Sequence, residues 1–323
     1  MRVHILDDWA DTLRGLPSFG RLSDHEVTVW TDHVTDVDAL AERLSDAEAL
    51  VLFRERTPIG AELLSRLPKL RLVAMRGAHP HVDVEACTAH GVTLASNKGK
   101  VAISTAPAEL TFALILAAAR RLPEQFASVK EGRWQAEIGI SLHGRTLGLY
   151  GYGRIAGQVA GYAEAFGMRP VWWGSEEGRA RAAAEGREVA GSREAFFAGS
   201  DVVSLHVRLA PATRGLITAS DLTAMQPHAI FVNTSRAGLV APGALEAALA
   251  AGRPGRIALD VFDTEPLTDP SDPVLSHHRV IATPHIGFVT TDELDLQFGE
   301  VYDLVNAFAA GRPVHVVNPE ARG

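Results

Sequence analysis

Short apolar runs separated by amphipathic helical patterns recur along nearly the whole chain. The first hundred residues contain RVHIL, EVTVW, ALVLF, LRLVAM and VTLAS, and the part after residue 145 contains TLGLYG, RPVWW, DVVSLH, AIFVN, RIALDV and VIATPH. Helix-like stretches such as DALAERL, IAGQVAGYAEAF and GALEAALAAG lie between them. Because strands at this spacing are joined by helical crossovers, the pattern predicts parallel sheets built from βαβ units.

The runs fall into two sets, which predicts two sheets. A mostly apolar segment, residues 105–132, is expected to form one long helix between the sets, with residues 97–104 as the crossover before it. The expected boundaries are residues 1–98 with 291–323 for one domain and 99–290 for the other. The predicted fold class is α/β, with two Rossmann-like, doubly wound parallel-sheet domains and a cleft between them.

Composition disfavours several kinds of partner. The formal net charge is −8 and no long run of Lys and Arg occurs, so a nucleic-acid partner is not expected. No segment is apolar for long enough to span a membrane, and acids stand near the N-terminus where a signal peptide has apolar residues. The single cysteine, Cys87, excludes an intrachain disulfide and a Cys-based zinc site. It is expected to be a buried, inert thiol, and a cytoplasmic location is expected.

A glycine-rich turn follows the strand-like run TLGLY and opens a helix. The segment GYGRIA is a G-x-G-x-x-A form of the dinucleotide fingerprint, in which glycines let a pyrophosphate approach the backbone and the helix N-terminus attracts it. The alternative is a glycine-rich turn without a ligand. The context of strand, turn, helix and second strand favours the nucleotide and makes residues 99–290 the dinucleotide-binding domain. The residues expected at this site are Gly151, Tyr152, Gly153, Arg154 and Ile155.

The next strand, RPVWW, ends at Gly174-Ser175 without an acid. An NAD enzyme commonly has Asp or Glu at this position to bind the ribose hydroxyls, and such an acid repels a 2′-phosphate. Ser175 with Arg179 or Arg181 would suit that phosphate, which favours NADP slightly over NAD. The acids at 176–177 are the counter-argument, because they would serve as the ribose-binding acid or as first-turn helix acids. The arginines would equally suit a solvated helix face.

Three later strand ends carry polar residues that a buried strand does not need. Arg236 follows AIFVN, Asp260 and Glu265 follow RIALD, and His285 follows VIATP. The carboxyl ends of parallel strands meet at one edge, so these side chains are expected near the cofactor. Arg236 would bind a carboxylate and polarise the adjacent carbonyl, and His285 would protonate that carbonyl as hydride arrives. Glu265 would orient the imidazole and favour its protonated form. Each residue alone also has a purely structural interpretation.

The segments GYGRIAG, SLHVRLAPATRGLI, FVNTSRAGLV, ALDVFDTEP and TPHIG together resemble the D-2-hydroxyacid dehydrogenase family, which includes phosphoglycerate dehydrogenases and glyoxylate/hydroxypyruvate reductases. The resemblance implies an NAD(P)-dependent oxidoreductase that acts on a small 2-keto or 2-hydroxy acid, with Arg236, Glu265 and His285 as the catalytic residues. It implies that Asp260 meets the nicotinamide carboxamide. The other residues that it implies along the cofactor are His206, Thr213, Thr234 and Gly287.

The resemblance also makes residues 1–98 with 291–323 a flavodoxin-like, substrate-binding domain. The family's glycine-rich loop, whose amides bind the substrate carboxylate, corresponds to MRGAHPHVDVEA, with Gly77, Ala78 and His79 at the turn. The added histidines depart from the common pattern, so the usual substrates need not apply, and a metal site is not expected. Arg54 is expected to contact a distal anion of the substrate or to lie on the surface.

Three functions follow from the resemblance. The first is a reductase of a small 2-keto acid, giving the D-hydroxy acid, and the alternative from another class is a nucleotide-sensing corepressor or scaffold. Oxidation of phosphite remains open, whereas Glu265 argues against formate, since formate enzymes pair the histidine with an amide. A homodimer formed through the apolar helix 105–122 is expected, because that helix would otherwise expose a large apolar patch.

Overall fold

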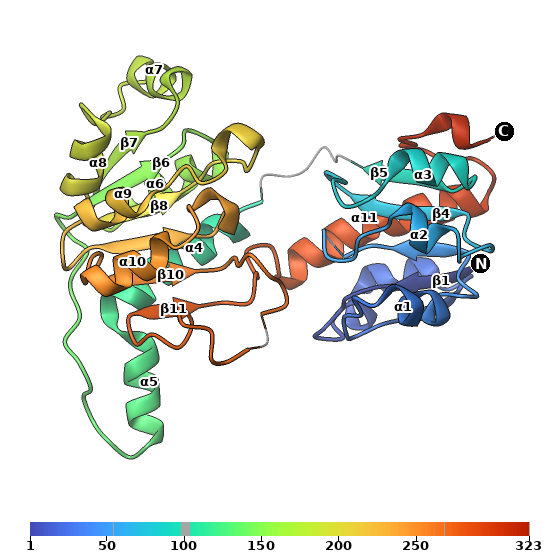
Figure 1. The fold of residues 1–323 in the computed structure, drawn as a ribbon, viewed down its shortest axis with the longest axis horizontal. Helices are drawn as coiled ribbons and strands as arrows, with labels where there is room; N and C mark the ends of the chain where they lie inside the picture. Colours follow the sequence, from blue (N-terminus) through green and yellow to red (C-terminus); the bar gives the residue numbers. More distant parts are fainter. Residues whose placement is uncertain (54, 98–103, 268, 323) are drawn as a thin grey trace. The chain divides into compact units, whose positions relative to one another are not determined.

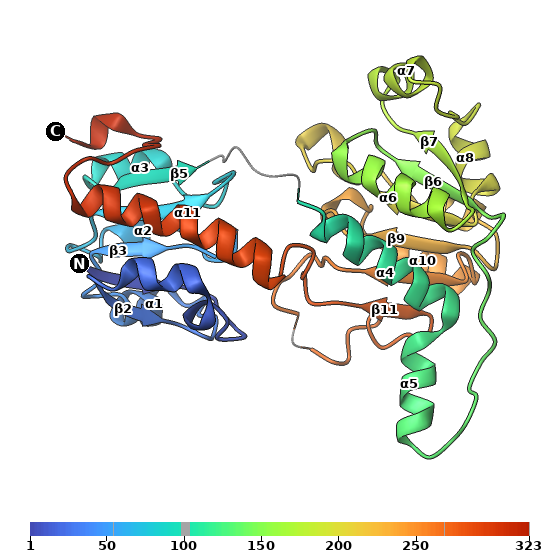
Figure 2. The ribbon, with the colours of Figure 1, turned by 180° about the vertical axis from the view of Figure 1, so that it is seen from behind.

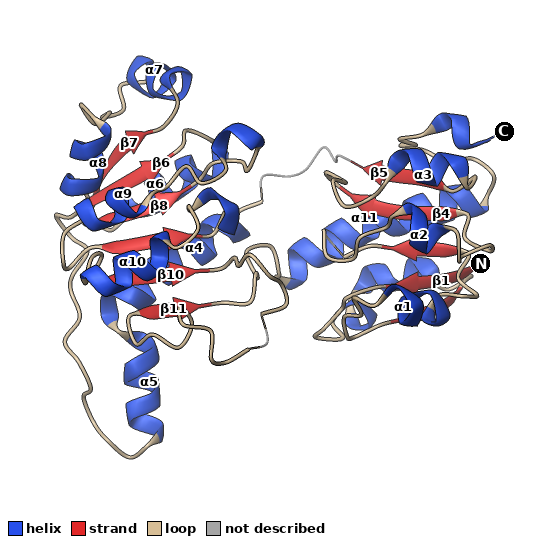
Figure 3. Cartoon of the chain, in the orientation of Figure 1, coloured by secondary structure: helices blue, strands red, loops and turns tan. Residues whose placement is uncertain are grey.

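The computed structural model describes residues 1–53, 55–97, 104–267 and 269–322. Arg54 and most of the crossover expected at 97–104 therefore lie outside the described residues. The chain divides into two compact units, Met1–Ser104 with Val289–Gly323, and Thr105–Phe288. Each unit contains one parallel sheet with helices on both faces, as the sequence pattern predicted (Figure 1, Figure 3).

The sheet of the first unit has the strand order β2-β1-β3-β4-β5, and every pairing is parallel. The order changes direction between β1 and β3, as in flavodoxin-like folds. Its strands are β1 (Arg2–Ile5), β2 (Glu26–Val29), β3 (Ala49–Val51), β4 (Leu72–Arg76) and β5 (Thr93–Asn97). Its helices are α1 (Val37–Arg43), α2 (Ala61–Leu64), α3 (Val84–Ala89) and α11 (Thr291–Ala309), with short 3-10 turns η1 (Leu13–Gly15), η2 (Pro17–Leu22) and η5 (Pro319–Arg322).

Strand side chains alternate between the two faces of this sheet. Leu50 and Val73 pack beneath α1, α2 and α3, whereas their neighbours Val51 and Ala74 pack beneath α11, η1 and η2. Figure 2 shows α11 lying along its face of the sheet. Cys87 is fully buried on the α3 side, as predicted, and burial raises the pKa of its thiol to about 11.

The sheet of the second unit has the order β11-β10-β9-β8-β6-β7, again entirely parallel. A parallel bridge between Trp172 and Val189 continues the pairing beyond β7. The chain therefore winds outward in both directions from β6 and β8, where the strand order reverses. The strands are β6 (Thr146–Tyr150), β7 (Arg169–Trp173), β8 (Val202–Leu205), β9 (Ile230–Asn233), β10 (Arg256–Leu259) and β11 (Val280–Ala282).

One face of this sheet packs on α4, α6 and α7, and the other on α8, α9 and α10. Figure 1 shows α9 and α10 over the second face, and Figure 2 shows α4 and α6 over the first. Ser175 and Ser192 cap α7 and α8 by accepting a hydrogen bond from the first turn. The bounds are α4 (Ala106–Arg120), α5 (Leu122–Lys130), α6 (Arg154–Ala165), α7 (Glu176–Ala184), α8 (Arg193–Gly199), α9 (Ala219–Ala224) and α10 (Ala244–Ala251), with η3 (Pro211–Thr213) and η4 (Ala237–Leu239).

The long helix expected over residues 105–132 is broken, and that prediction is wrong. Arg121 adopts a left-handed conformation (φ 58°), and α5 starts in a new direction after it. Pro123 has no amide hydrogen to donate to the Ala119 carbonyl four residues earlier, and its ring would clash there. That carbonyl accepts a hydrogen bond from the Ile140 amide instead (2.8 Å). Figure 3 shows α5 and the loop after it extending away from the sheet of their own unit.

Helix α4 is also not the exposed apolar element that was expected. Phe112, Leu114 and Ile115 are buried in the core that α4 shares with α6 and the sheet. The large apolar side chains that are exposed in this region belong to α5 and the following loop. Among the described residues, no helix combines the length and the apolar character needed to cross a bilayer.

Candidate functional site

Gly151 lies where β6 ends and the order of the second sheet reverses. Its φ is 111°, and a Cβ at this position would lie 2.4 Å from the His206 carbonyl oxygen at the end of β8, so only glycine fits. Gly153 is the N-cap of α6 and has no side chain to cap the helix. The first amides of the helix, Arg154 and Ile155 among them, therefore have no acceptor within it. This turn fits the pyrophosphate of a dinucleotide.

The end of β7 lies against the same turn. Gly174 follows Trp173 with a φ of 152°, and a Cβ there would approach the Gly151 amide nitrogen to 3.4 Å. The hydroxyl of Ser175 accepts a hydrogen bond from an amide in the first turn of α7 at 3.2 Å. The guanidinium carbon of Arg179 stands 4.3 Å from the centre of the Trp173 ring. The turn expected at Gly174-Ser175 is therefore also the place where the backbone after β7 approaches the backbone of the glycine turn at Gly151.

A second arginine is fixed beside the turn. Arg181 donates a hydrogen bond from Nη2 to the carbonyl oxygen of Tyr152 (3.2 Å) and lies over the Tyr152 ring. Arg179 Nε is buried and has no hydrogen-bond partner in the part of the chain that the structure describes. Both guanidinium groups thus lie next to the glycine turn, while Glu176 and Glu177 are exposed in the first turn of α7.

The three expected catalytic residues follow three neighbouring strands. Because β9, β10 and β11 are adjacent and parallel, the segments after them share one edge of the sheet. Arg236 follows β9, Glu265 follows β10, and His285 follows β11. Arg236 is exposed, and its Nη1 donates to the Ser235 carbonyl oxygen at 2.8 Å.

Asn233, which the sequence interpretation missed, shapes the segment that carries Arg236. Its amide side chain donates to the Arg236 carbonyl oxygen and accepts from the Ser235 amide, both at 3.0 Å. The Ser235 hydroxyl donates to the Leu205 carbonyl oxygen at the end of β8 (2.6 Å). Asn233 is 1% exposed, so these bonds are shielded from water. The sequence signal that could have identified it is a polar amide at the end of the apolar run FVN, directly before the TSR segment.

His285 and Glu265 form a close pair. Nδ1 of His285 lies 2.6 Å from Oε2 of Glu265, and the other carboxylate oxygen accepts from the Phe262 amide at 3.0 Å. Both side chains are about a quarter exposed, at 26% and 28%. His285 has a φ of 53°, which is uncommon for a residue other than glycine and often marks a functional position. The contact with Glu265 engages Nδ1, so Nε2 is the ring nitrogen left for other contacts.

Asp260 is fully buried and holds the turn that carries His285. One carboxylate oxygen accepts from the Thr283 hydroxyl (2.6 Å) and the Ile286 amide (2.8 Å), and the other accepts from the Gly287 amide (3.0 Å). Burial raises the pKa of Asp260, while these hydrogen bonds and the nearby His285 oppose the shift. The contact with a nicotinamide carboxamide, implied by resemblance, stays a prediction, and so does the cofactor contact of Gly287.

The remaining residues expected along the cofactor lie in unit two with their polar groups already engaged. The Thr213 hydroxyl donates to the Arg208 carbonyl oxygen (2.7 Å), which braces the loop after β8. The Thr234 hydroxyl lies 2.7 Å from that of Thr111 on α4. Nε2 of His206 lies 2.9 Å from the hydroxyl of Ser204.

The expected substrate loop lies in the first unit, after β4. Gly77 has a φ of 92°, and its amide donates to the Asn97 carbonyl oxygen at 3.0 Å, so this amide is engaged within the fold. Within the described residues, no hydrogen bond is found for the amides of Ala78 and His79. Both ring nitrogens of His81 are buried without a partner among those residues, and burial lowers its pKa.

A metal site finds no support in the described ranges. They contain no group of three or more His, Cys, Asp or Glu side chains placed to hold a metal ion. Arg54, the other residue expected near the substrate, lies outside the described residues.

The burial of His206 leads us to expect that the protein becomes less stable as the pH falls below neutral. Burial lowers the pKa of His206 to about 4 from the ordinary 6.5, so the unfolded chain binds this proton more readily than the folded one. The free energy of unfolding should therefore fall as pH drops from about 6.5 towards 4, with about 2 kcal/mol lost between pH 7 and pH 5. His206→Gln should remove that part of the dependence in urea unfolding at both pH values, whereas His278→Gln, at an exposed position, should keep it. Equal slopes in the three proteins would contradict the assignment.

Comparisons with known proteins point to one family. The family model described as "D-isomer specific 2-hydroxyacid dehydrogenase, NAD binding domain" matches residues 112–287. The chain is 37% identical to a glyoxylate reductase of Aeropyrum pernix over 310 residues, which are 92% of this chain and 90% of that protein. It is 36% identical over 267 residues to a D-3-phosphoglycerate dehydrogenase of Methanocaldococcus jannaschii, covering 82% of this chain but only 50% of that protein.

Solved structures agree with the sequence comparisons. A crystal structure of a phosphoglycerate oxidoreductase from Vibrio cholerae has 43% identity and a TM-score of 0.91, covering 96% of this chain and 99% of that one. The family model spans more than half of this chain. The match with the Aeropyrum protein covers almost the full length of both proteins. The chain therefore belongs to the D-isomer-specific 2-hydroxyacid dehydrogenase family of nicotinamide-dependent oxidoreductases.

Proposed function

We propose that this protein reduces a small 2-keto acid to the D-2-hydroxy acid. The observation that carries the proposal is the pair of His285 and Glu265, 2.6 Å apart, at the same sheet edge as Arg236. A carbonyl that accepts hydride needs a proton on its oxygen, and a histidine held by a carboxylate supplies one. A bound nicotinamide cofactor supplies the hydride.

The protein's own groups divide the work as follows. Glu265 fixes the imidazole through Nδ1, so that Nε2 of His285 donates the proton to the carbonyl oxygen. The guanidinium of Arg236 binds the carboxylate through its planar fork and polarises the neighbouring carbonyl. Asp260 keeps the 283–287 turn in place through three donors, and so positions His285.

The test of the function is a substrate panel. The protein is mixed with NADPH or NADH and glyoxylate, hydroxypyruvate, phenylpyruvate, 2-ketoisocaproate or phosphonopyruvate, and absorbance at 340 nm is followed. Relatives named glyoxylate reductase and D-3-phosphoglycerate dehydrogenase support two kinds of first candidate: keto acids without a large side chain, and keto acids with an anionic group at the far end. Turnover with at least one member is expected. Bound nucleotide without turnover of any member would contradict the reductase proposal.

We place the substrate carboxylate at the loop after β4. The amides of Ala78 and His79 support this, because the described part of the chain offers them no acceptor, whereas Gly77 serves mainly to make the turn. Ala78 is exposed and His79 is partly exposed, so a ligand can reach this turn, and an anion there would accept hydrogen bonds from the two amides. His81, neutral through its burial, would contact the rest of the substrate, and Arg54 is assigned to a distal anion.

NADPH is the proposed reductant in preference to NADH. Position 174 carries glycine rather than an acid, so no carboxylate occupies the place where a ribose-binding acid is common. Arg179, held over Trp173, and Arg181, bonded to the Tyr152 carbonyl, put two positive charges beside the end of β7. Two exposed acids in the first turn of α7 weaken this preference through their charge.

Ser175→Asp tests the preference for NADPH. A carboxylate at the end of β7 should repel a 2′-phosphate and raise KM for NADPH by about tenfold, equivalent to about 1.4 kcal/mol. KM for NADH, measured on the same protein, is the internal control and should stay the same or fall. Arg179→Gln should also raise KM for NADPH alone. An unaltered protein with a lower KM for NADH than for NADPH would contradict the proposal.

We also propose a homodimer, built on α5 and the loop after it rather than on α4. Four apolar side chains in this arm are largely exposed: Phe126 (61%), Val129 (59%), Trp134 (80%) and Ile138 (95%). Arg256, almost fully buried at the start of β10, pairs with Glu124 of α5 and holds the arm to its unit. An anchored arm with exposed apolar groups suits a second copy of the chain.

Light scattering after size exclusion tests the dimer. The unaltered protein should have twice the mass of one chain, and the double substitution Trp134→Glu with Ile138→Glu should give a monomer, because two charges would be buried in the interface. Leu296→Glu is the control, since it changes a half-exposed leucine of α11 in the other unit. A monomeric unaltered protein, or a dimeric double variant, would count against the arm.

A cytoplasmic location is part of the proposal. Its support is the single free and buried cysteine, which suits a reducing compartment. Cell fractionation with antibody detection checks it, and recovery of the protein outside the cytoplasmic fraction would refute it.

A further inference from the structure

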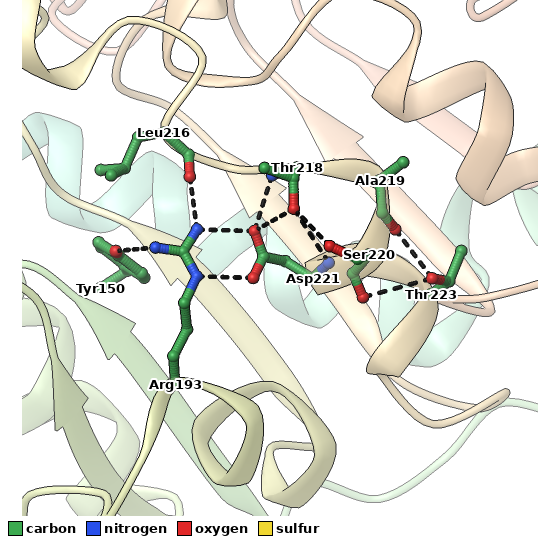
Figure 4. Close-up of polar contacts among 8 residues, drawn as sticks. All are labelled: Tyr150, Arg193, Leu216, Thr218, Ala219, Ser220, Asp221 and Thr223. Carbon is green, nitrogen blue, oxygen red and sulfur yellow. Dashed lines mark hydrogen bonds and ion pairs between the residues drawn. The ribbon is translucent and has the colours of Figure 1, made fainter.

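Arg193, the first residue of α8, links three different elements of the second unit (Figure 4). Its Nε and Nη2 each donate to the Asp221 carboxylate at 2.7 Å, which makes a two-bond ion pair with α9. Nη2 also donates to the Leu216 carbonyl oxygen, and Nη1 donates to the Tyr150 hydroxyl at 3.2 Å. The fork of a guanidinium can satisfy three acceptors in one plane, which an ammonium group cannot.

Asp221 is the second centre of this cluster and is well shielded. Its side chain is 8% exposed, and its carboxylate also accepts from the amide and the hydroxyl of Thr218, each at 2.7 Å. The resulting cap starts α9. Burial opposes ionisation of this carboxyl, but the bonds from Arg193 and Thr218 still hold the pKa of Asp221 below its usual value. The pair is therefore ionised and fully hydrogen-bonded.

The cluster grips a loop that begins beside the glycine turn. We call residues 206–218, between β8 and α9, the strap. The strap starts at His206, whose carbonyl oxygen lies so close to Gly151 that a Cβ there would come within 2.4 Å. It ends at Leu216 and Thr218, which both bond to the cluster. Its far end is thus fixed by Arg193 and Asp221.

Another partner of Arg193 lies directly before the glycine turn. Tyr150 is the last residue of β6, directly before Gly151, and it is 4% exposed. The strand β6 and the strap lie on the two sides of the point where the strand order reverses, which is where a nucleotide binds in such sheets. One guanidinium group therefore ties both sides of the predicted nucleotide site together from the α8 face.

The strap is also bonded to the segment after Arg236. The Gly215 amide donates to the Gly238 carbonyl oxygen (2.9 Å), and Ile217 pairs with Val240 in a parallel bridge. These backbone contacts do not involve Arg193 or Asp221, so the segment after Arg236 keeps its links to the strap when the cluster is broken.

We propose that Arg193 and Asp221 are positioning residues for the nicotinamide nucleotide: they hold the strap at the spacing from the glycine turn that the nucleotide needs. Neither residue touches the reacting atoms. The proposal rests on nucleotide binding by this unit and does not depend on which keto acid is reduced. Its consequence is that nucleotide affinity should fall when the cluster is broken, while the chemical step changes little.

Nucleotide affinity of Arg193→Gln is the direct test. The Kd for NADPH and NADH, measured by calorimetry, should rise about tenfold, because residues in one polar network are energetically coupled and the loss of one displaces the others. Arg193→Lys should not restore affinity, since lysine lacks the fork. Tyr150→Phe, which removes one hydroxyl and keeps the buried ring, should raise Kd about threefold, within the range expected for one hydrogen bond. In steady-state kinetics, KM for the nucleotide should rise while kcat at saturation stays near its original value.

Arg145→Gln is the matched control. Arg145 pairs with Asp201 at 2.7 Å with similar exposure, but directly before β6, at the opposite edge of the same sheet. It should lower the melting temperature without changing Kd. An unchanged Kd in Arg193→Gln, with a loss of stability equal to that of Arg145→Gln, would overturn the proposal. If the unaltered chain itself binds neither nucleotide, both this inference and the reductase proposal fail; if it binds but does not turn over the panel, only the reductase proposal fails.

Discussion

His285→Ala should lower kcat by about 10²–10⁴-fold, the range that a general acid contributes. Nε2 of His285 is the proton donor in the proposed reaction. Among the described residues at that sheet edge, no other histidine is paired with a carboxylate. The Kd for the nucleotide should change little, because in the proposed reaction the imidazole contacts the keto acid and not the pyrophosphate. Stopped-flow measurement of hydride transfer, together with calorimetric titration of NADPH, separates the two effects.

His228→Ala is the control for this loss. His228 also has a ring nitrogen on a carboxylate, with Nε2 2.8 Å from Asp201, but it lies before β9 at the opposite edge of the sheet. Its replacement should leave turnover unchanged. Glu265→Gln should give an intermediate loss, because the neutral amide holds the imidazole less firmly than the carboxylate that lies 2.6 Å from Nδ1. Substantial turnover by His285→Ala would remove the histidine from the mechanism.

The strands and the sheet class were predictable because a buried parallel strand must be almost continuously apolar. Runs such as TLGLY and AIFVN stand out for this reason, and each became a strand, which is followed by the glycine turn in the first case and by Arg236 in the second. Arg236, Glu265 and His285 could be assigned to one edge by the same rule, since parallel strands point the same way. The proximity of Glu265 to His285 follows from adjacent strands, β10 and β11.

Other features depend on contacts that sequence does not display. Arg193 lies in SREAFF, where it looks like an ordinary first-turn residue, and its partner Asp221 is 28 residues away. The bonds that both oxygens of Asp260 accept from the turn around His285 are likewise not visible in the sequence. The break after α4 could have been predicted from the sequence, since Pro123 removes a helical donor. The apolar run around it favoured one continuous helix instead.

Arg236→Gln should lower kcat/KM for the keto acid by about 10³-fold, or about 4 kcal/mol of transition-state stabilisation. The guanidinium is charged at any working pH and binds a carboxylate through two parallel bonds, so a neutral amide loses both charge and fork. Arg236→Lys should recover only part of the loss, because an ammonium group keeps the charge without the fork. A rise in KM for the keto acid together with a fall in kcat would indicate that the arginine acts in binding and in polarising the carbonyl.

Arg214→Gln is the matched comparison. Arg214 belongs to the strap, and its guanidinium approaches Gly238 in the segment after Arg236. It is therefore a second arginine in the same part of the unit, but it has no proposed contact with the substrate. Its replacement should change kcat/KM by less than about tenfold, as expected for a group that does not meet the reacting carboxylate. Asn233→Ala should fall between the two, since the loss of its bonds to Ser235 and to the Arg236 backbone displaces the arginine without removing its charge. If Arg236→Gln and Arg214→Gln lowered kcat/KM equally, the special role of Arg236 would be refuted, and a general electrostatic attraction of the anionic substrate would explain both losses.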